Sequence, residues 1–267
     1  MELGFKKVEI EGLEINLVSC KTALSISHLE SDYALNPYRG CSHGCRYCYS
    51  PCVLREERTW GEFLDVKRNI PNVLSKELKK KKRGLVRIGS VTDPYQEAEE
   101  KFELTRRCLE QLSRDDFPVL IQTKSGLVKR DIDLFKKMDS DIGFTITSLD
   151  ENFRKKFEPN APPVSERLSA IRELREEGLD LWVFIGPLFP YLNDGRKDLL
   201  RLKKTLESLD IEDIYLDKLN MRKGVWDNIK PMLEPDMQRR YKNIYFDSND
   251  YFKNKKKMYK SIGKTVF

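Results

Sequence analysis

The feature that most constrains this fold is a repeated alternation of short apolar segments and amphipathic helices between residues 85 and 219. Short apolar runs that alternate with helical periodicity are typical of parallel βαβ units. With the strand that precedes residue 36 we count about six such units, which favours an α/β fold with a partial (β/α)6 TIM-like barrel over a closed eightfold barrel. The expected strands are 85–91, 118–123, 141–149, 179–189 and 211–219, and the expected helices are 72–82, 99–114, 129–138, 164–177 and 197–209.

The segments on either side of this alternation have a different character. Residues 5–27 largely alternate apolar and polar positions and predict strands that lead into the barrel, whereas the chain after Pro51 is polar and irregular up to Asn69. From residue 221 the chain is rich in Lys, Arg, Tyr and Asn. We therefore expect a core of residues 1–220 and a basic, aromatic-rich helical extension of residues 221–267 packed on it.

The stretch YFKNKKKMYK near the C-terminus mixes bases with aromatic residues. This composition is used to hold single-stranded nucleic acid by stacking and phosphate attraction. A solvated helix with its aromatic side chains packed inward is the favoured interpretation. The net charge of +6 permits contact with nucleic acid without requiring it.

Three thiols are crowded into one loop, NPYRGCSHGCRYCYSP, which covers residues 36–51. Cys41, Cys45 and Cys48 have a C-x3-C-x2-C spacing, and Cys52 follows. A four-thiolate zinc site usually pairs two C-x2-C knuckles, and a closed ferredoxin cluster usually has C-x2-C-x2-C. Both remain alternatives, with Cys52 as the fourth thiol. The spacing favours three thiolates on a four-iron cluster, which leaves one iron open to a small ligand.

Cysteine usage and hydropathy indicate the cellular compartment of the protein. The chain has 6 Cys in 267 residues, which is too few for a secreted disulfide framework and indicates metal-binding thiols in a reducing compartment. The N-terminal residues lack the apolar region of a signal peptide, and no apolar run approaches a membrane span. We therefore expect a cytoplasmic location and no membrane partner.

The cysteine loop resembles that of the radical S-adenosylmethionine (SAM) superfamily, and residues 33–193 resemble its spore photoproduct lyase-like branch. The resemblance implies a four-iron, four-sulfur (4Fe–4S) cluster on Cys41, Cys45 and Cys48, with SAM bound to the free iron. It also implies reductive cleavage of SAM to a 5′-deoxyadenosyl radical, which abstracts a hydrogen atom from a substrate. An electron donor of the flavodoxin or ferredoxin type would supply the electron.

The same resemblance assigns roles to residues at the ends of the strands. GSVTDPYQEAE (89–99), TKS (123–125), TITSLD (145–150) and Gly186-Pro187 match segments of the branch. The cofactor-binding residues implied are Tyr47, Ser90, Thr92, Asp93, Lys124, Thr147, Ser148 and Gly186. Of these, the Ser90, Thr92 and Asp93 side chains and Lys124 would contact the methionyl part of SAM, Thr147 and Ser148 the ribose, and Tyr47 and Gly186 the adenine.

Two tyrosines are the catalytic candidates. Tyr49 matches a radical-relay tyrosine of the branch, and Tyr95, like Gln96, is expected to face the cavity. His43 and Arg39 border the cluster and either donate hydrogen bonds to it or solvate the loop. Ser90-Val91 stands where spore photoproduct lyase has a hydrogen-donating cysteine, which argues against thymine-dimer repair by that route.

The sequence leaves the substrate open. Nucleic acid is the first candidate, a protein or peptide the second, and a small molecule the third. A function of another class is a nucleic-acid-binding module with a structural metal site and the basic tail. It would bind zinc and nucleic acid in a salt-dependent manner and would not cleave SAM.

Overall fold

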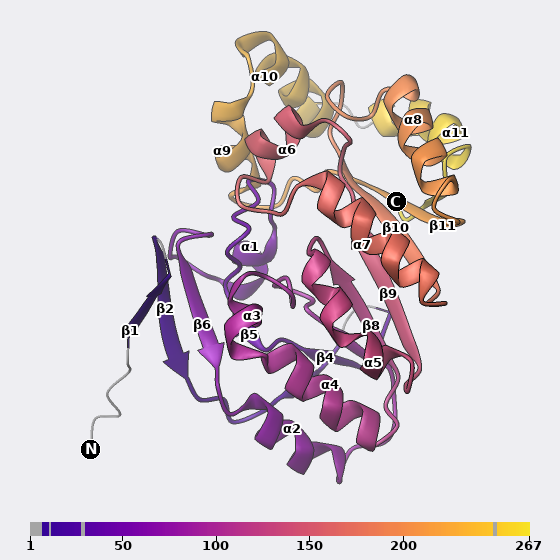
Figure 1. Ribbon diagram of the computed structural model, residues 1–267. Helices are drawn as coiled ribbons and strands as arrows, with labels where there is room; N and C mark the ends of the chain where they lie inside the picture. Colours follow the sequence, from indigo (N-terminus) through magenta and orange to yellow (C-terminus); the bar gives the residue numbers. More distant parts are fainter. Residues whose placement is uncertain (1–6, 11, 28–29, 248–249) are drawn as a thin grey trace.

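The computed structural model describes residues 7–10, 12–27, 30–247 and 250–267, and its centre is an open eight-stranded sheet (Figure 1). The strand order is β12-β11-β10-β9-β8-β7-β4-β3. Strands β4, β7, β8, β9, β10 and β11 are parallel to their neighbours, β12 is parallel to β11, and β3 is antiparallel to β4. The predicted partial (β/α)6 barrel is confirmed. The strands are β3 Leu24–Ile26, β4 Tyr33–Leu35, β7 Val86–Ile88, β8 Val119–Thr123, β9 Ser140–Thr145, β10 Leu181–Leu188, β11 Asp213–Lys218 and β12 Lys264–Thr265.

Helices connect successive barrel strands, and their bounds differ locally from the prediction. The predicted helix 99–114 is broken at Glu103, which has a φ of 50°. The break has a cause, because the buried Glu99 carboxylate accepts hydrogen bonds from the amides of Thr105 and Arg106 and so caps the second helix. The predicted helix 129–138 is a 3-10 turn followed by one helical turn. The elements are α2 Ile70–Leu78, α3 Ala98–Phe102, α4 Leu104–Arg114, η1 Gly126–Asp131, α5 Ile132–Phe135, α6 Glu151–Phe157, α7 Val164–Glu176 and α8 Arg196–Glu207.

A second, smaller sheet lies beside the barrel, with the order β1-β2-β6-β5 (Figure 1). Its strands are β1 Lys7–Ile10, β2 Leu13–Val18, β5 Tyr38–Arg39 and β6 Phe63–Lys67. Two predictions are corrected here. The irregular segment after Pro51 contains α1 Ser50–Leu54 and β6, and of the expected N-terminal strands only β3 joins the barrel sheet. Residues 5, 6 and 11 of that prediction lie outside the described residues.

The last helix of the C-terminal extension packs aromatic side chains inward, whereas Phe246 before it is 60% exposed. It comprises α9 Val225–Ile229, η2 Lys230–Met232, α10 Pro235–Lys242, the π-helix η3 Asn243–Asp247, α11 Asp250–Lys260 and the strand β12. Phe252 and Tyr259 on α11 are buried, while Lys253 and Lys256 are exposed. The favoured interpretation of this stretch is therefore confirmed, with the correction that the extension also adds a strand to the barrel sheet.

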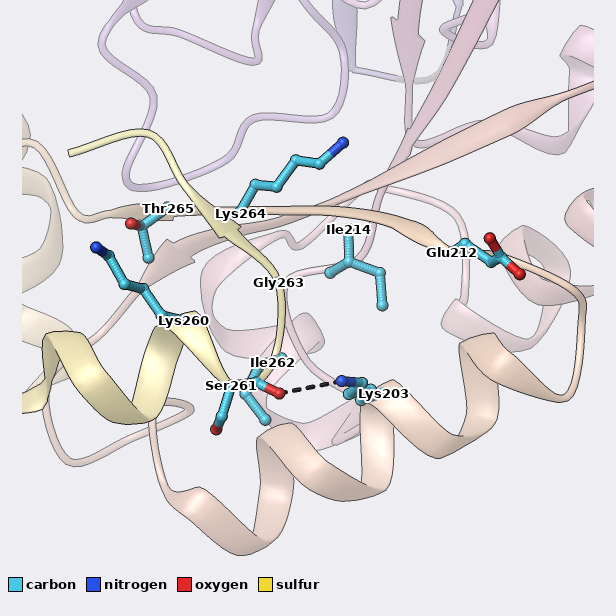
Figure 2. A pocket seen from close by; sticks show the side chains of 9 residues that line it. All are labelled: Lys203, Glu212, Ile214, Lys260, Ser261, Ile262, Gly263, Lys264 and Thr265. Atoms are coloured by element: carbon cyan, nitrogen blue, oxygen red, sulfur yellow. Dashed lines mark hydrogen bonds between the residues drawn. The ribbon is translucent and has the colours of Figure 1, made fainter.

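A pocket lies where β12 meets α8 and α11, and no residue of the cysteine loop lines it (Figure 2). Lys203 donates a hydrogen bond of 3.0 Å to the carbonyl of Ser261 at its base. Lys260 and Lys264 also line it, and the Lys264 ammonium pairs with Asp213 at 2.6 Å. This pocket lies at the contact between the extension and the barrel, and it is separate from the site described below.

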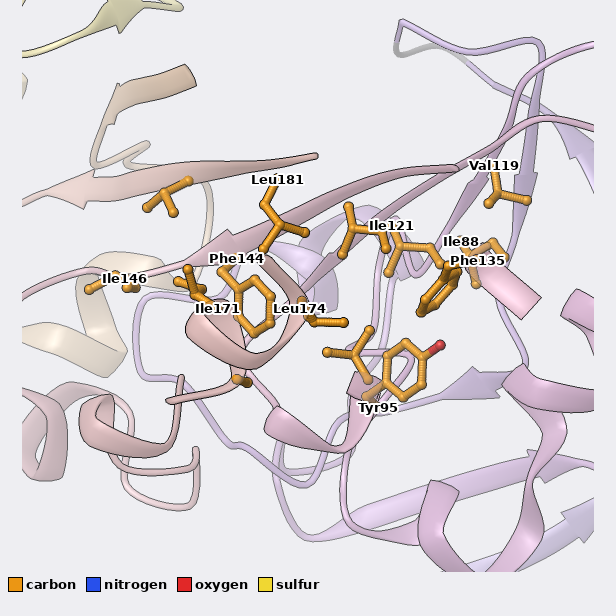
Figure 3. Close-up of a cluster of buried hydrophobic side chains, with 14 of the residues drawn as sticks. Ile88, Tyr95, Val119, Ile121, Phe135, Phe144, Ile146, Ile171, Leu174 and Leu181 are labelled. Atoms are coloured by element: carbon orange, nitrogen blue, oxygen red, sulfur yellow. The ribbon is translucent and has the colours of Figure 1, made fainter. Parts of the chain in front are cut away.

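The main core lies between the barrel strands and the helices that cover them (Figure 3). Ile88, Ile121, Phe144 and Val183 are fully buried and belong to this core. Because side chains alternate across a strand, the helix-facing positions are apolar and the other face of the sheet is free for different residues.

Candidate active site

The cysteine loop is held tightly by glycines at places where no side chain fits. Gly40 has a φ of +96°, and a Cβ there would lie 2.5 Å from the carbonyl oxygen of Phe63. Gly61 has a φ of +100°, and a Cβ there would lie 2.8 Å from the Cα of Gly44. Such contacts and backbone angles are tolerated by glycine alone. The loop is thus packed directly against the turn before β6.

Cys41 and Cys45 are buried in this loop, and Cys48 is half-buried. Burial raises the pKa of all three thiols, to about 12 for Cys45, and charge on Cys45 and Cys48 raises the pKa of Cys41 further. The three groups are therefore close enough to repel one another as thiolates. Only a strong positive charge can keep three buried thiolates together, which fits the irons of a cluster.

The donor set fits a cluster better than a single ion. In the part of the chain that the structure describes, no three His, Cys, Asp or Glu side chains are arranged around one ion position. Thiolates that ligate separate irons do not need that arrangement. Cys52, on α1, is half-buried.

The TDPYQ segment after β7 clamps the loop from one side. The Gln96 side-chain oxygen accepts a 2.8 Å hydrogen bond from the amide of Ser42, and its nitrogen donates to the Thr92 hydroxyl at 2.8 Å. Thr92 in turn donates to the carbonyl of Gly40 at 2.5 Å. Gln96 is fully buried, so the expectation that it faces a cavity is wrong. Both side chains are engaged in fixing the backbone of the cysteine loop.

Asp93, in the segment after β7, lies beside the end of β8 and accepts three hydrogen bonds with its carboxylate. It accepts hydrogen bonds from the Thr123 hydroxyl at 2.6 Å, the Tyr95 amide at 2.9 Å and the Lys124 amide at 2.8 Å. Its Oδ2 is also 3.5 Å from Nδ1 of His43. The carboxylate is thus oriented rigidly beside the cysteine loop.

His43 is only 4% exposed, so it does not solvate the loop. Burial lowers the pKa of its imidazole to about 4, against the opposing attraction of Asp93. The ring is therefore neutral at neutral pH. A neutral ring has one N–H to donate, and Asp93 is within reach of Nδ1. Arg39, by contrast, points away from the thiols to Glu56, with which it pairs at 2.9 Å.

A second buried network lies on the other side of the loop. The Tyr47 hydroxyl donates to Glu158, whose other oxygen pairs with Arg167 at 2.6 Å. The Thr147 hydroxyl lies 2.6 Å from the same oxygen of Glu158 that accepts from Tyr47, and 2.9 Å from the carbonyl of Gly186. Glu158 and Arg167 are 1% and 0% exposed, and the pair holds the pKa of Glu158 at about 2 despite burial. The network fixes the ring of Tyr47 beside the cysteines.

The same segment after α6 also holds the loop backbone. The side-chain amide of Asn160 donates to the carbonyl of Ser42 at 3.0 Å, and its backbone amide donates to the carbonyl of His43 at 3.3 Å. The amide of Arg46 donates to the carbonyl of Phe157 at 2.9 Å. Sequence reasoning missed Glu158, Asn160 and Arg167, because none stands next to a recognisable motif. The only local signal was the Pro-containing turn in EPNAPP after a predicted helix.

Lys124 points back over the site from the end of β8. Its ammonium lies 5.7 Å from the centre of the Tyr47 ring. Burial disfavours the charged form, but the attraction of Cys45 and Glu158 outweighs it and raises the pKa of Lys124. The lysine thus stays charged beside Tyr47 of the cysteine loop. Whether it contacts the methionyl part of SAM stays a prediction.

The remaining predicted cofactor residues are spread along the same edge of the sheet. The Ser90 hydroxyl accepts a 3.0 Å hydrogen bond from Asn36, and the Ser148 hydroxyl accepts from the amide of Asp150 at 3.1 Å. A Cβ on Gly186 would lie 2.2 Å from the ring of Phe184, so the glycine is already required by its neighbour. Whether these three residues contact SAM stays a prediction.

The two catalytic candidates occupy different environments. Tyr49 is 39% exposed at the end of the cysteine loop, with the guanidinium of Arg222 5.6 Å from its ring centre. Tyr95 is 1% exposed and lies in the main core, where it donates to Asp131 at 2.9 Å (Figure 3). The expectation that Tyr95 faces the cavity is wrong, because the turn after β7 directs its ring to Asp131 in the core.

A buried carboxylate attaches the C-terminal extension beside this edge. Asp194 is fully buried and accepts hydrogen bonds from the hydroxyls of Tyr251 and Tyr259 at 2.9 and 2.8 Å. It also pairs with Lys255 at 2.8 Å.

Among the described residues, no helix is long and apolar enough to span a bilayer.

Comparison with known proteins places the fold and the site in context. The uncharacterized protein MJ0683 of Methanocaldococcus jannaschii is 35% identical over 68% of this chain and 70% of its own length. The uncharacterized protein Rv2578c of Mycobacterium tuberculosis is 28% identical over 89% of this chain and 75% of its own length. Spore photoproduct lyase complexed with dinucleoside spore photoproduct superposes with a TM-score of 0.66 at 17% identity, over 87% of this chain and 80% of that chain.

The family model described as the radical SAM superfamily matches residues 35–202, which span the cysteine loop and the barrel from β4 to α8. An enzyme of this kind uses a 4Fe–4S cluster and SAM and needs an electron donor. The buried thiols, the lysine and carboxylate beside them and the six parallel strands agree with that match. The chain therefore belongs to the radical SAM superfamily.

Proposed function

We propose that Cys41, Cys45 and Cys48 are the ligands of the cluster and that Cys52 is not. The observation that carries this proposal is the burial of the three thiols in one glycine-fitted loop, where the thiolates need a positive charge. When bound, the cluster and SAM together supply a 5′-deoxyadenosyl radical that takes a hydrogen atom from the substrate. The chain's own residues orient SAM, exclude water and hold the loop.

Several side chains are positioned to orient SAM. Lys124 offers a positive charge to the SAM carboxylate, and Asp93 offers a fixed carboxylate to its ammonium. Tyr47 and Thr147, held by Glu158, border the space for adenine and ribose. The buried positions of these groups keep water from the reacting atoms and strengthen their charges.

The cluster ligands are tested by anaerobic reconstitution of the wild type, Cys45→Ala and Cys52→Ala. We expect brown wild-type protein that, after reduction, converts SAM to 5′-deoxyadenosine and methionine. Cys45→Ala should lose both properties, and Cys52→Ala should keep the iron and labile sulfide of the wild type. A Cys45→Ala variant that kept both would refute the ligand assignment. Loss of iron in Cys52→Ala would instead support a closed four-thiolate cluster.

We further propose that the substrate is a nucleic acid, with a protein or peptide as the alternative, and that a flavodoxin or ferredoxin in the cytoplasm supplies the electron. The net charge of +6 supports the first choice, and the absence of a thiol at Ser90-Val91 argues against repair that needs a cysteine donor there. Transfer of deuterium from labelled candidate substrates into 5′-deoxyadenosine tests the choice. Label from a peptide but not from an oligonucleotide would contradict it.

A further inference from the structure

The inner face of the barrel is lined with polar and aromatic side chains, in contrast to its apolar outer face. Val86 and Ile88 are buried in the core beneath the helices, so Arg87 between them projects to the opposite side of β7. A closed barrel would fill this interior with layers of branched apolar residues. Here the inner positions include Arg87, Gln122, Asp141, Trp182, Tyr215 and Asp217, which are half-buried or exposed, beside the buried Leu120 and Thr145.

Arg87 stands out because it is half-buried and forms no salt bridge among the described residues. Its Nε is buried without a hydrogen bond, and among the described residues no carboxylate lies within ion-pair distance of its guanidinium. The buried Arg167 is paired with Glu158, and the half-buried Arg130 with Glu99 at 2.6 Å. Burial lowers the pKa of Arg87, so the fold holds a desolvated cation at a cost in stability. An unpaired charge of this kind is typical of a group that awaits a ligand.

A second cation approaches the same place from a different element. Arg222, in the loop after β11, lies with its guanidinium 5.6 Å from the centre of the Tyr49 ring. Burial raises the pKa of Tyr49, as does Cys48, while the charges of Arg222 and Arg87 both act to lower it. Arg222 therefore lies beside Tyr49 at the end of the cysteine loop, and Tyr49 and Arg87 act on each other electrostatically. Glu30 and Asp141 influence Arg87 and Asp217 influences Tyr49, but among the described residues none of the three carboxylates forms a salt bridge with either arginine.

We propose that Arg87 and Arg222 bind an oxyanion of the substrate, a phosphate or a carboxylate, beside Tyr49 on the inner face of the barrel. A guanidinium presents a planar set of donors that matches both oxyanions. Binding would pair the unpartnered Nε of Arg87 and remove its desolvation cost. The anion anchors the substrate next to the cysteine loop, so the proposal identifies a charge that the substrate must carry. As a substrate site it rests on the radical SAM function proposed above.

Protection from an arginine reagent tests the site without relying on turnover. Cluster-loaded protein with SAM is treated anaerobically with phenylglyoxal in chloride, phosphate or acetate at equal ionic strength. Modification of Arg87 is then measured by peptide mass spectrometry. At an anion concentration of about twice the dissociation constant, modification should fall about threefold relative to chloride. Arg172, an exposed arginine on α7, is the control and should be modified equally in all three salts.

The arms of the experiment separate the two oxyanions. Protection by phosphate alone identifies a phosphate group, protection by acetate alone a carboxylate, and protection by both an oxyanion site without preference. Equal modification of Arg87 in all three salts overturns the proposal.

Thermal unfolding of Arg87→Met gives a second measurement. The variant should melt no lower than the wild type in chloride, since an unpaired cation has been removed. A protecting anion should raise the melting temperature of the wild type and of Arg172→Met by about 2 °C, and Arg87→Met should not show this rise. A rise equal to that of the wild type overturns the proposal. If SAM is not cleaved but Arg87 is protected, the proposed function fails and the anion site stands.

Discussion

The buried pair of Glu158 and Arg167 offers a sharp test of the network behind the cysteine loop. Replacement by Glu158→Gln keeps the size of the side chain and an oxygen for the hydroxyls of Tyr47 and Thr147. It removes the charge opposite Arg167, which is fully buried. Breaking one partner of such a pair costs about 3–5 kcal/mol, because an uncompensated charge is left in the interior.

The pKa of Glu158 gives an independent magnitude. Its pKa is lowered from 4.5 to about 2, which corresponds to about 3 kcal/mol of stability at neutral pH. Because the folded-state pKa lies below the unfolded value, this stability is present above pH 4.5 and is lost as the pH falls toward 2. Both routes predict that Glu158→Gln lowers the free energy of unfolding by about 3 kcal/mol at pH 7.

Urea denaturation of cluster-loaded protein, followed by circular dichroism, measures this loss. With a slope of about 3 kcal/mol per molar urea, the midpoint should fall by about 1 M. At pH 4 the difference between wild type and variant should narrow by about 1 kcal/mol, because the wild type has begun to lose the contribution of Glu158. Glu166→Gln, an exposed neighbour on α7, should change the midpoint little.

The double variant Glu158→Gln, Arg167→Met separates the unpaired charge from lost packing. It should be more stable than the sum of the two single losses predicts, because neither charge is then left alone. A midpoint for Glu158→Gln within error of Glu166→Gln, or a deficit that does not narrow at pH 4, would refute the reasoning.

Three further predictions concern other contacts of the site. Gly61→Ala should lower the iron content after reconstitution, because the new Cβ would lie 2.8 Å from the Cα of Gly44 and cost about 1–3 kcal/mol of stability. The control Gly178→Ala, at a glycine that also has a positive φ but no neighbour within 4 Å, should keep the iron content of the wild type. Equal iron in the two variants would contradict this prediction. Tyr95→Phe should cost about 1 kcal/mol in stability and leave SAM cleavage unchanged, and a lost cleavage rate at unchanged stability would restore its catalytic role. Asp194→Asn should cost about 1–3 kcal/mol and speed tryptic cleavage within residues 250–260, and unchanged proteolysis would argue against its attachment role.

The barrel was predictable because its strands and helices have strong local periodicity. Ile142, Phe144 and Val183 fall on one face of their strands and made the parallel βαβ pattern visible. The small sheet was not predictable in the same way. FLDVK (63–67) is too short to show alternation, and β6 is fixed by pairing with β2, which lies far away in the sequence.

The same contrast holds at the site. The strand-end position of Lys124 predicted a contact with SAM, which stays a prediction, but its ammonium does lie beside Tyr47 of the cysteine loop, since the ends of parallel strands meet at one edge. Tyr95 and Gln96 lie near the same edge, but the prediction that they face the cavity was wrong. The turn after β7 directs the Tyr95 side chain to Asp131 and the Gln96 side chain to the amide of Ser42. Which way a turn residue points depends on the hydrogen bonds available to it, and those partners are distant in the sequence.

The three thiols define the chemistry, but their placement depends on segments that the cysteine spacing does not reveal. Gln96 is bonded to the loop across 54 residues of sequence and Asn160 across 118. Each replaces water at a backbone group of Ser42 that would otherwise be buried without a partner, which would cost about 1–3 kcal/mol. A cysteine motif in a loop without such anchors would leave its thiols free to separate, because their mutual repulsion favours an open loop. The assembled barrel is therefore what holds these three thiols together as the proposed ligands of one cluster.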